Sequence, residues 1–188
     1  MIYLLGIKHD IQLGLRPLLA DRFVELVKEI ITRIPIELVC EEVSIDVLKG
    51  VGIKTSPLEE LCKTLKVRYK ACDPTDKERL AKKILSPEEK LNIMQKLFES
   101  FKANIINRKP ATEYQELRKI LAKDDRKREK FWFSKIKGEK SKNILFICGT
   151  GHISSYRSSQ GKGFDKMLKQ NKWKAKTLAI LTEDNLSS

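Results

Sequence analysis

The chain of 188 residues has no long apolar run and no paired-cysteine motif, and each absence argues against a class of protein. No stretch approaches the ~20 uninterrupted apolar residues of a membrane span. The N-terminus has the pattern of a strand and not of a charged and then apolar leader, so we expect a cytoplasmic protein without a membrane span. A chain of this length has room for one domain with a core of its own.

The four cysteines have no C-x-x-C spacing, which argues against a zinc ribbon and against a redox dithiol motif. In a cytoplasmic protein we expect them to be free and buried. They are Cys40, Cys62, Cys72 and Cys148.

The chain has only two histidines, and each ends a Gly-x-x-His tetrapeptide that follows a short apolar run. The tetrapeptides are Gly6 to His9 and Gly149 to His152. Short runs of β-branched and aromatic residues stopped by glycine are typical of buried strands that enter a loop. Both imidazoles are therefore predicted just past the carboxyl end of a strand, where open α/β sheets bind ligands. The alternative is two loop histidines far apart in space, because sequence position does not tell which strands are adjacent.

Alternating strand and helix patterns predict a three-layer α/β fold with a mainly parallel sheet of about five strands. Residues 76–138 lack a strand pattern and are predicted to form a helical insertion that caps the strand carboxyl ends, within a single domain over residues 1–188. The alternative for this insertion is a helical flank that only covers the sheet. Ser56-Pro57 and Ser86-Pro87 are typical helix starts. The predicted strands are 2–6, 36–40, 67–72, 143–148 and 174–181, the longest predicted helices are 16–33 and 112–136, and 154–163 is a predicted loop.

Imidazoles and carboxylates follow four of the predicted strands. They are His9, the pair Glu41 and Glu42, Asp73, and His152. A histidine held by a carboxylate acts as a general base on water near neutral pH. The same residue types bind a divalent metal ion that lowers the pKa of a bound water, with His9, His152 and Glu42 as the ligands. The sequence leaves both routes open, and both predict hydrolysis of an ester or amide, with arginines of the insertion stabilising a developing oxyanion.

The double Gly-x-x-His motif, with a Glu pair after the second strand, resembles the superfamily that contains erythromycin esterase-like, ChaN-like and TraB/Tiki-type proteins. The resemblance implies a parallel α/β core with helical additions and a pocket at the strand ends. It also implies that His9, His152, one of Glu41 and Glu42, and an arginine on a helix build this pocket. Arg128 is the candidate for this arginine, because the segment from Arg128 to Trp132 is similar to an Arg-Glu-x-x-Trp pattern of small bacterial members.

Members of this superfamily differ in chemistry, so the resemblance does not select a reaction: some hydrolyse esters without metal, some are metal-dependent peptidases and one type binds haem. The chain is shorter than the macrolide esterases and has no transmembrane segment, which argues against the macrolide esterases and against the membrane-bound branch.

Trp132 is expected to anchor the insertion, the alternative being that it stacks on a ligand.

The formal net charge of +13 is concentrated in two segments. Residues 77–142 contain 20 Lys and Arg against 10 Asp and Glu, and residues 157–176 contain 7 against 1. A basic surface attracts polyanions, so the second hypothesis is a non-enzymatic protein that binds nucleic acid or another anionic partner. Lysine interleaved with glutamate at helical spacing is more typical of a solvated helix face, and no nucleic-acid-binding motif is present, which favours the hydrolase. These patterns do not specify the small-molecule or peptide substrate or the oligomeric state.

Overall fold

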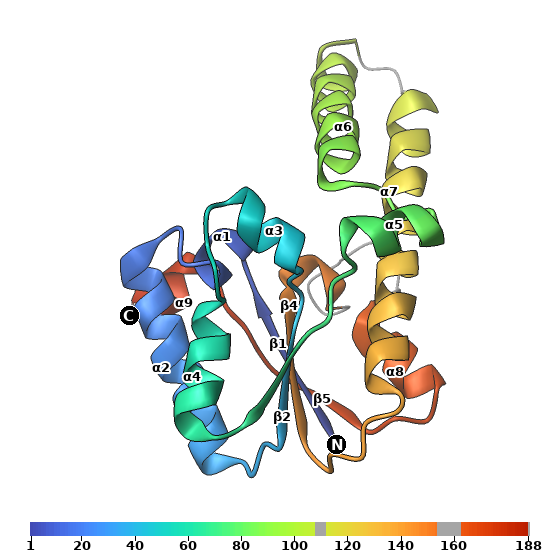
Figure 1. Ribbon diagram of the computed structural model, residues 1–188. Helices are drawn as coiled ribbons and strands as arrows, with labels where there is room; N and C mark the ends of the chain where they lie inside the picture. Colours follow the sequence, from blue (N-terminus) through green and yellow to red (C-terminus); the bar gives the residue numbers. More distant parts are fainter. Residues whose placement is uncertain (108–111, 154–162, 188) are drawn as a thin grey trace. The chain divides into compact units, whose positions relative to one another are not determined.

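The computed structural model describes residues 1–107, 112–153 and 163–187, and over these ranges it confirms an α/β fold (Figure 1). The strands are β1 (Ile2–Ile7), β2 (Leu38–Glu41), β3 (Arg68–Ala71), β4 (Ile144–Gly149) and β5 (Ala175–Ile180). The helices are α1 (His9–Gln12), α2 (Pro17–Arg33), α3 (Ile45–Gly50), α4 (Pro57–Leu65), α5 (Asp76–Lys82), α6 (Pro87–Asn107), α7 (Thr112–Ile136), α8 (Phe164–Gln170) and α9 (Glu183–Ser187), with the short 3-10 helix η1 (Thr150–His152).

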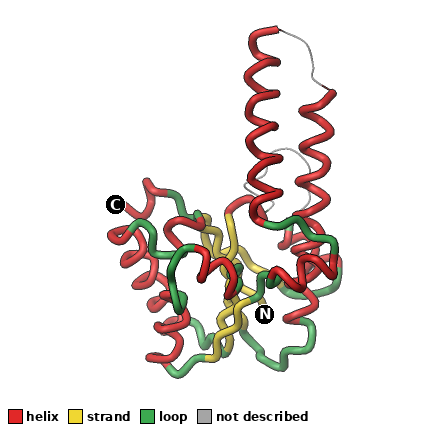
Figure 2. Tube along the Cα trace, turned by 45° about the horizontal axis from the view of Figure 1, so that its top comes forward, coloured by secondary structure: helices red, strands yellow, loops and turns green. Residues whose placement is uncertain are grey.

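The strands form one parallel sheet in the order β3-β2-β4-β1-β5. The chain passes from β1 to β2 without pairing them and later inserts β4 between the two. In Figure 2 the strands lie together between helices. Because all strands run in one direction, their carboxyl ends meet at a single edge of the sheet.

The predicted helix starts are confirmed by their hydrogen bonds. Ser56 caps α4 by accepting from the backbone N–H of Leu58 at 3.2 Å, and Pro57 fills the first helical position. At the start of α6 the Ser86 hydroxyl accepts from the Glu89 backbone N–H at 3.1 Å. The Glu89 carboxylate accepts from the Ser86 backbone N–H at 2.7 Å, which makes the reciprocal pair of a capping box.

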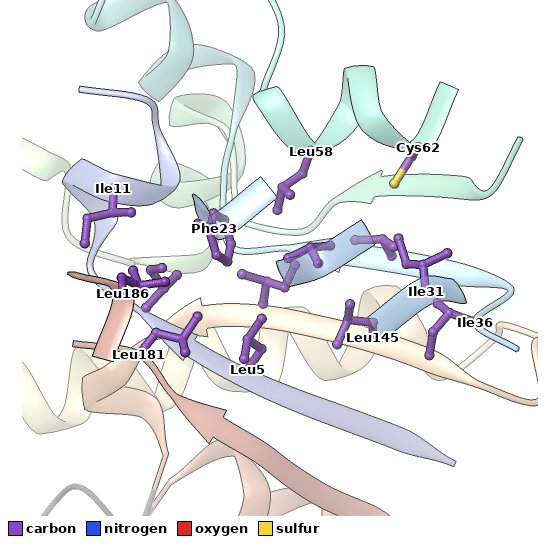
Figure 3. Close-up of a cluster of buried hydrophobic side chains, with 14 residues drawn as sticks. Leu5, Ile11, Phe23, Ile31, Ile36, Leu58, Cys62, Leu145, Leu181 and Leu186 are labelled. Atoms are coloured by element: carbon purple, nitrogen blue, oxygen red, sulfur yellow. The ribbon is translucent and has the colours of Figure 1, made fainter. Parts of the chain in front are cut away.

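One face of the sheet packs against α2, α4 and α9 (Figures 1 and 3). Alternate residues of the strands point to this face, as the two-residue period of a strand requires. Figure 3 shows Leu5 and Leu145 of the sheet beside Phe23 and Ile31 of α2 and Leu58 of α4. This apolar layer fixes the helices that follow β1 and β2.

The opposite face carries an aromatic cluster. Phe146 of β4, Phe164 of α8 and Trp132 near the end of α7 have ring centroids between 4.7 and 5.6 Å apart, and all three side chains are fully buried. Such rings bury large areas and prefer tilted or edge-to-face contacts, as here. With helices on both faces, the α/β unit has three layers.

The chain divides into two compact units. The first comprises Met1–Asp73 and Trp132–Ser188 and contains the sheet, and the second comprises Pro74–Phe131 and is helical where it is described. The second unit falls within the segment predicted as a helical insertion, apart from its first residues. Its position over the strand ends stays a prediction.

Further features of the described residues bear on the sequence predictions. The four cysteines are buried and form no disulfide, as predicted. No helix among the described residues is both long enough and apolar enough to cross a membrane. The loop predicted for residues 154–163 lies, apart from Gly163, outside the described residues.

We expect Phe23→Ala to lower the free energy of unfolding by about 3–5 kcal/mol, because it leaves a cavity in the α2 layer. Leu18→Ala on the same helix is the matched control, since Leu18 is 82% exposed and its truncation is expected to change stability by less than about 0.5 kcal/mol. Denaturant unfolding of both variants measures the difference. Equal losses in the two variants would contradict the packing described here.

Candidate functional site

The strand order brings three of the predicted polar strand ends side by side. In the sheet Ile7 of β1 is paired with Gly149 of β4, and Glu41 of β2 is paired with Ile147 of β4. His9 follows β1 by two residues, Glu42 follows β2 directly, and His152 ends the 3-10 turn η1 after β4. The insertion of β4 between β1 and β2 is therefore what joins the two Gly-x-x-His motifs to the Glu pair.

Glu42 stands between the two imidazoles. Its Oε1 atom is 3.5 Å from Nε2 of His9 and 3.5 Å from Nε2 of His152. Its Oε2 atom accepts a hydrogen bond of 2.7 Å from the backbone N–H of Gly149. The side chain of Glu42 is completely buried. One carboxylate thus bridges both histidines and is itself tied to β4.

The two histidines differ in their access to solvent. The side chain of His9 is 49% exposed, whereas that of His152 is only 6% exposed. Trp132 covers His152 with an edge-to-face contact, the ring centroids being 4.7 Å apart. The Trp132 Nε1–H donates to Oδ1 of Asp73 at 3.0 Å. His9 is therefore the histidine that solvent reaches, and Trp132 is a fully buried side chain that Asp73 helps to position.

Gln12 connects His9 to the other glutamate of the pair. Gln12 lies three residues after His9 on α1, so the two side chains share a helix face. The Oε1 atom of Gln12 is 3.2 Å from Nδ1 of His9. Its Nε2 donates to Oε1 of Glu41 at 2.9 Å and to the backbone carbonyl of Glu42 at 3.4 Å.

Glu41 is held by two hydroxyl groups. The Ser56 hydroxyl and the Tyr69 hydroxyl each donate to Oε2 of Glu41 at 2.6 Å. Burial raises the pKa of the Glu41 carboxyl, while the hydrogen bonds from Ser56, Tyr69 and Gln12 act in the opposite direction. Burial, together with the nearby Glu41 carboxylate, also raises the pKa of Tyr69. Glu41 is thus an anchor beneath the site, and Glu42 is the glutamate that faces the imidazoles.

The glycine of each Gly-x-x-His motif makes room for the other motif. A Cβ atom on Gly149 would lie 2.9 Å from Nε2 of His9 and 3.5 Å from Oε2 of Glu42. A Cβ atom on Gly6 would lie 2.8 Å from Cδ1 of Ile153 and 3.5 Å from Cα of Thr150. Distances under 3.0 Å are too short for carbon, so a Cβ atom at either position would have to displace the side chain of His9 or of Ile153.

The structure joins most, but not all, of the predicted site residues. Glu42 contacts both histidines, Glu41 reaches His9 through Gln12, and Asp73 reaches His152 through Trp132. Arg128 is buried on α7 in the second unit, so its part in the site stays a prediction.

Sequence reasoning missed Gln12, Ser56 and Tyr69. The i, i+3 spacing of His9 and Gln12 was the available signal for Gln12, and it depends on a helix of only four residues. Ser56 was recognised only as a helix cap, and Tyr69 only as part of a strand.

His9, His152 and Glu42 are residue types that a divalent metal ion takes as ligands. However, the described part of the chain contains no group of three or more His, Cys, Asp or Glu side chains arranged so that it could hold a metal ion. The described residues therefore give the metal-assisted route no support of their own, and that route stays a prediction. The route without metal uses the imidazoles and the carboxylate themselves.

Comparison with known proteins gives no match to a family model, to a curated protein or to a solved structure. The resemblance to the double Gly-x-x-His superfamily stays a prediction that rests on the motifs.

We expect Gly149→Ala to displace His9 from Glu42 while leaving the fold intact, because the new methyl group meets the end of a half-exposed side chain. Gly50→Ala is the control, since nothing lies within 4 Å of a Cβ atom there. Because the chain has only two histidines, imidazole NMR signals report on each ring separately. A Gly149→Ala spectrum with an unmoved His9 signal would contradict the close approach.

The raised pKa of Glu41 predicts a pH dependence of stability. The folded state holds the proton of Glu41 more tightly than the unfolded chain, so stability is lost as the pH rises from the unfolded pKa through the folded one. We therefore expect wild type to lose free energy of unfolding relative to Glu41→Gln as the pH rises through this window. Glu116→Gln, at an exposed position, serves as the control. Parallel pH profiles for wild type and Glu41→Gln would show that the prediction is wrong.

Proposed function

We propose that the protein is a hydrolase of an ester or amide and that His9, Glu42 and His152 form its acid–base centre. The observation that carries the proposal is the Glu42 carboxylate at 3.5 Å from both imidazoles, at the carboxyl edge of a parallel sheet. An imidazole paired with a buried carboxylate is suited to proton transfer near neutral pH. The half-exposed His9 is the member of the centre that a substrate can approach.

The proposed reaction needs one water and no redox step. Nε2 of His9 takes a proton from the water as its oxygen attacks the carbonyl carbon of the substrate. The Glu42 carboxylate stabilises the imidazolium that forms. The tetrahedral intermediate then breaks its bond to the leaving oxygen or nitrogen, and that atom receives the proton from His9. Acid and alcohol, or acid and amine, are the products.

His152 contacts Glu42 directly, and Asp73 contributes indirectly by binding Trp132, which packs on His152. His152 presents Nε2 to the same oxygen of Glu42 that faces His9, and Trp132 and Asp73 hold the ring in place. The Gly149 N–H, and the imidazolium that His9 becomes during the reaction, offset the cost of burying the Glu42 charge. On the strength of the sequence motif, Arg128 is the proposed donor to the oxyanion.

We place this activity in the cytoplasm, a proposal supported by four buried cysteines that form no disulfide, which suits a reducing compartment. The second hypothesis, a protein that binds nucleic acid or another anionic partner through its basic segments, also stays a prediction. Several of the charges concerned are internally paired, such as Lys90 with Asp125 and Arg126 with Glu129. This pairing favours the hydrolase over the binding protein.

We expect His9→Gln and Glu42→Gln each to lower kcat/KM on a hydrolysed substrate by about 10²-fold or more, the size of a general acid–base contribution. The assay is turnover of a panel of chromogenic esters and amides by the purified chain. Glu29→Gln on α2 is the control, since its side chain is 58% exposed.

The control is expected to keep wild-type activity. The proposal fails if wild type turns over no member of the panel faster than Glu42→Gln does. It also fails if His9→Gln keeps wild-type kcat/KM.

A further inference from the structure

The amide of Gln12 has a single orientation that satisfies its neighbours. Gln12 is 1% exposed, so its polar atoms depend on protein partners. Its Nε2 group faces the Oε1 atom of Glu41 at 2.9 Å and the backbone carbonyl of Glu42 at 3.4 Å. A backbone carbonyl only accepts hydrogen bonds, so an amide turned by 180° would place two oxygens against each other. The NH₂ group therefore points to the glutamates and the carbonyl oxygen points to His9.

This orientation decides which nitrogen of His9 carries hydrogen. The Gln12 oxygen lies 3.2 Å from Nδ1 of His9 and can only accept. Nδ1 must therefore be the donor, and in the neutral ring Nε2 is left with the lone pair. We propose that Gln12 is a positioning residue that holds neutral His9 in the Nδ1–H tautomer. The catalytic meaning of this assignment rests on the proposed hydrolase function, whereas the tautomer itself does not.

Glu41 acts on His9 through Gln12. Its Oε2 atom is occupied by the hydroxyls of Ser56 and Tyr69, each at 2.6 Å, which leaves Oε1 to receive the Gln12 amide. These donors come from the N-terminus of α4 and from β3, so two further elements of the fold fix the carboxylate. The chain of hydrogen bonds therefore has one direction, from His9 through Gln12 to Glu41.

The tautomer places the reactive lone pair of His9 on Nε2, the nitrogen that lies near Glu42. Nε2 of His9 faces Oε1 of Glu42 at 3.5 Å, and both atoms are acceptors when the ring is neutral and the carboxyl is ionised. A proton taken up by Nε2 enters this space and turns two opposed acceptors into an ion pair. The opposite tautomer would already have a hydrogen there, and its lone pair would face the Gln12 oxygen.

The test is the tautomer of His9 in the full chain, read from two-bond ¹H–¹⁵N correlations of the imidazole at a pH where the ring is neutral. His152→Gln leaves one histidine in the chain and assigns the signals. We expect Nδ1–H for His9 in wild type and a shift toward the Nε2–H form in Gln12→Met, which keeps the length of the side chain but removes the acceptor. Gln95→Met, at an exposed position on α6, is the matched control and is expected to leave the tautomer unchanged.

Each outcome decides the assignment. An Nε2–H ring in wild type overturns it, and so does an Nδ1–H ring that persists in Gln12→Met. An unmoved His152 signal in Gln12→Met shows that the fold is kept. Should that variant fail to fold, Glu41→Gln is the second variant, and an unchanged His9 tautomer there overturns the anchoring role of Glu41.

Activity gives an independent readout. With a hydrolysed substrate, we expect Gln12→Met to lower kcat by about tenfold or more with little change in KM, because a wrong tautomer impairs proton transfer more than binding. Unchanged kcat in a variant with an altered tautomer overturns the positioning role. An Nδ1–H ring in a wild-type protein that hydrolyses nothing refutes the hydrolase proposal and leaves the tautomer assignment standing.

Discussion

The partners of one buried carboxylate set the arrangement of the strand ends. The Glu42 side chain is completely buried, and an isolated buried charge costs several kcal/mol even after relaxation. Its three partners come from the ends of two other strands, namely His9 after β1, and the Gly149 N–H and His152 at and after the end of β4. Burial of the carboxylate and correct placement of the three strands therefore require one another.

The predicted architecture follows from local patterns, and the predicted site follows only in part. The ends of every predicted strand agree with the structure within one or two residues. A strand buried between two helical layers has a short, nearly continuous apolar sequence, and polar residues mark its end. The order of the strands is set by long-range packing, so the sequence left open whether His9 and His152 meet. The choice between Glu41 and Glu42 depends on the last residue of β2, because neighbouring residues point to opposite faces of a strand. The role of Gln12 could not be predicted, because α1 has only four residues and so shows no helical hydrophobic period in the sequence.

The position of β4 also orders the assembly of the site. β1 and β2 do not pair with each other, because β4 lies between them and pairs with both. β4 is more than 100 residues further along the chain than either strand. The chain first completes β3 and the second compact unit, and only then supplies the central strand. Contacts of such sequence separation form late, because the entropy of closing the loop must be offset first. The approach of His9 to Glu42 therefore depends on a strand that the chain supplies late.

The two motif glycines make the two Gly-x-x-His tetrapeptides sterically dependent on each other. Gly149 keeps clear the space of His9, and Gly6 keeps clear the space of the turn that carries His152. A mutation that enlarges one glycine is felt by the histidine motif on the other strand, roughly 140 residues away in the chain. The two tetrapeptides therefore constrain each other, because a side chain larger than glycine at either position must displace atoms of the opposite motif or of the residue that follows it.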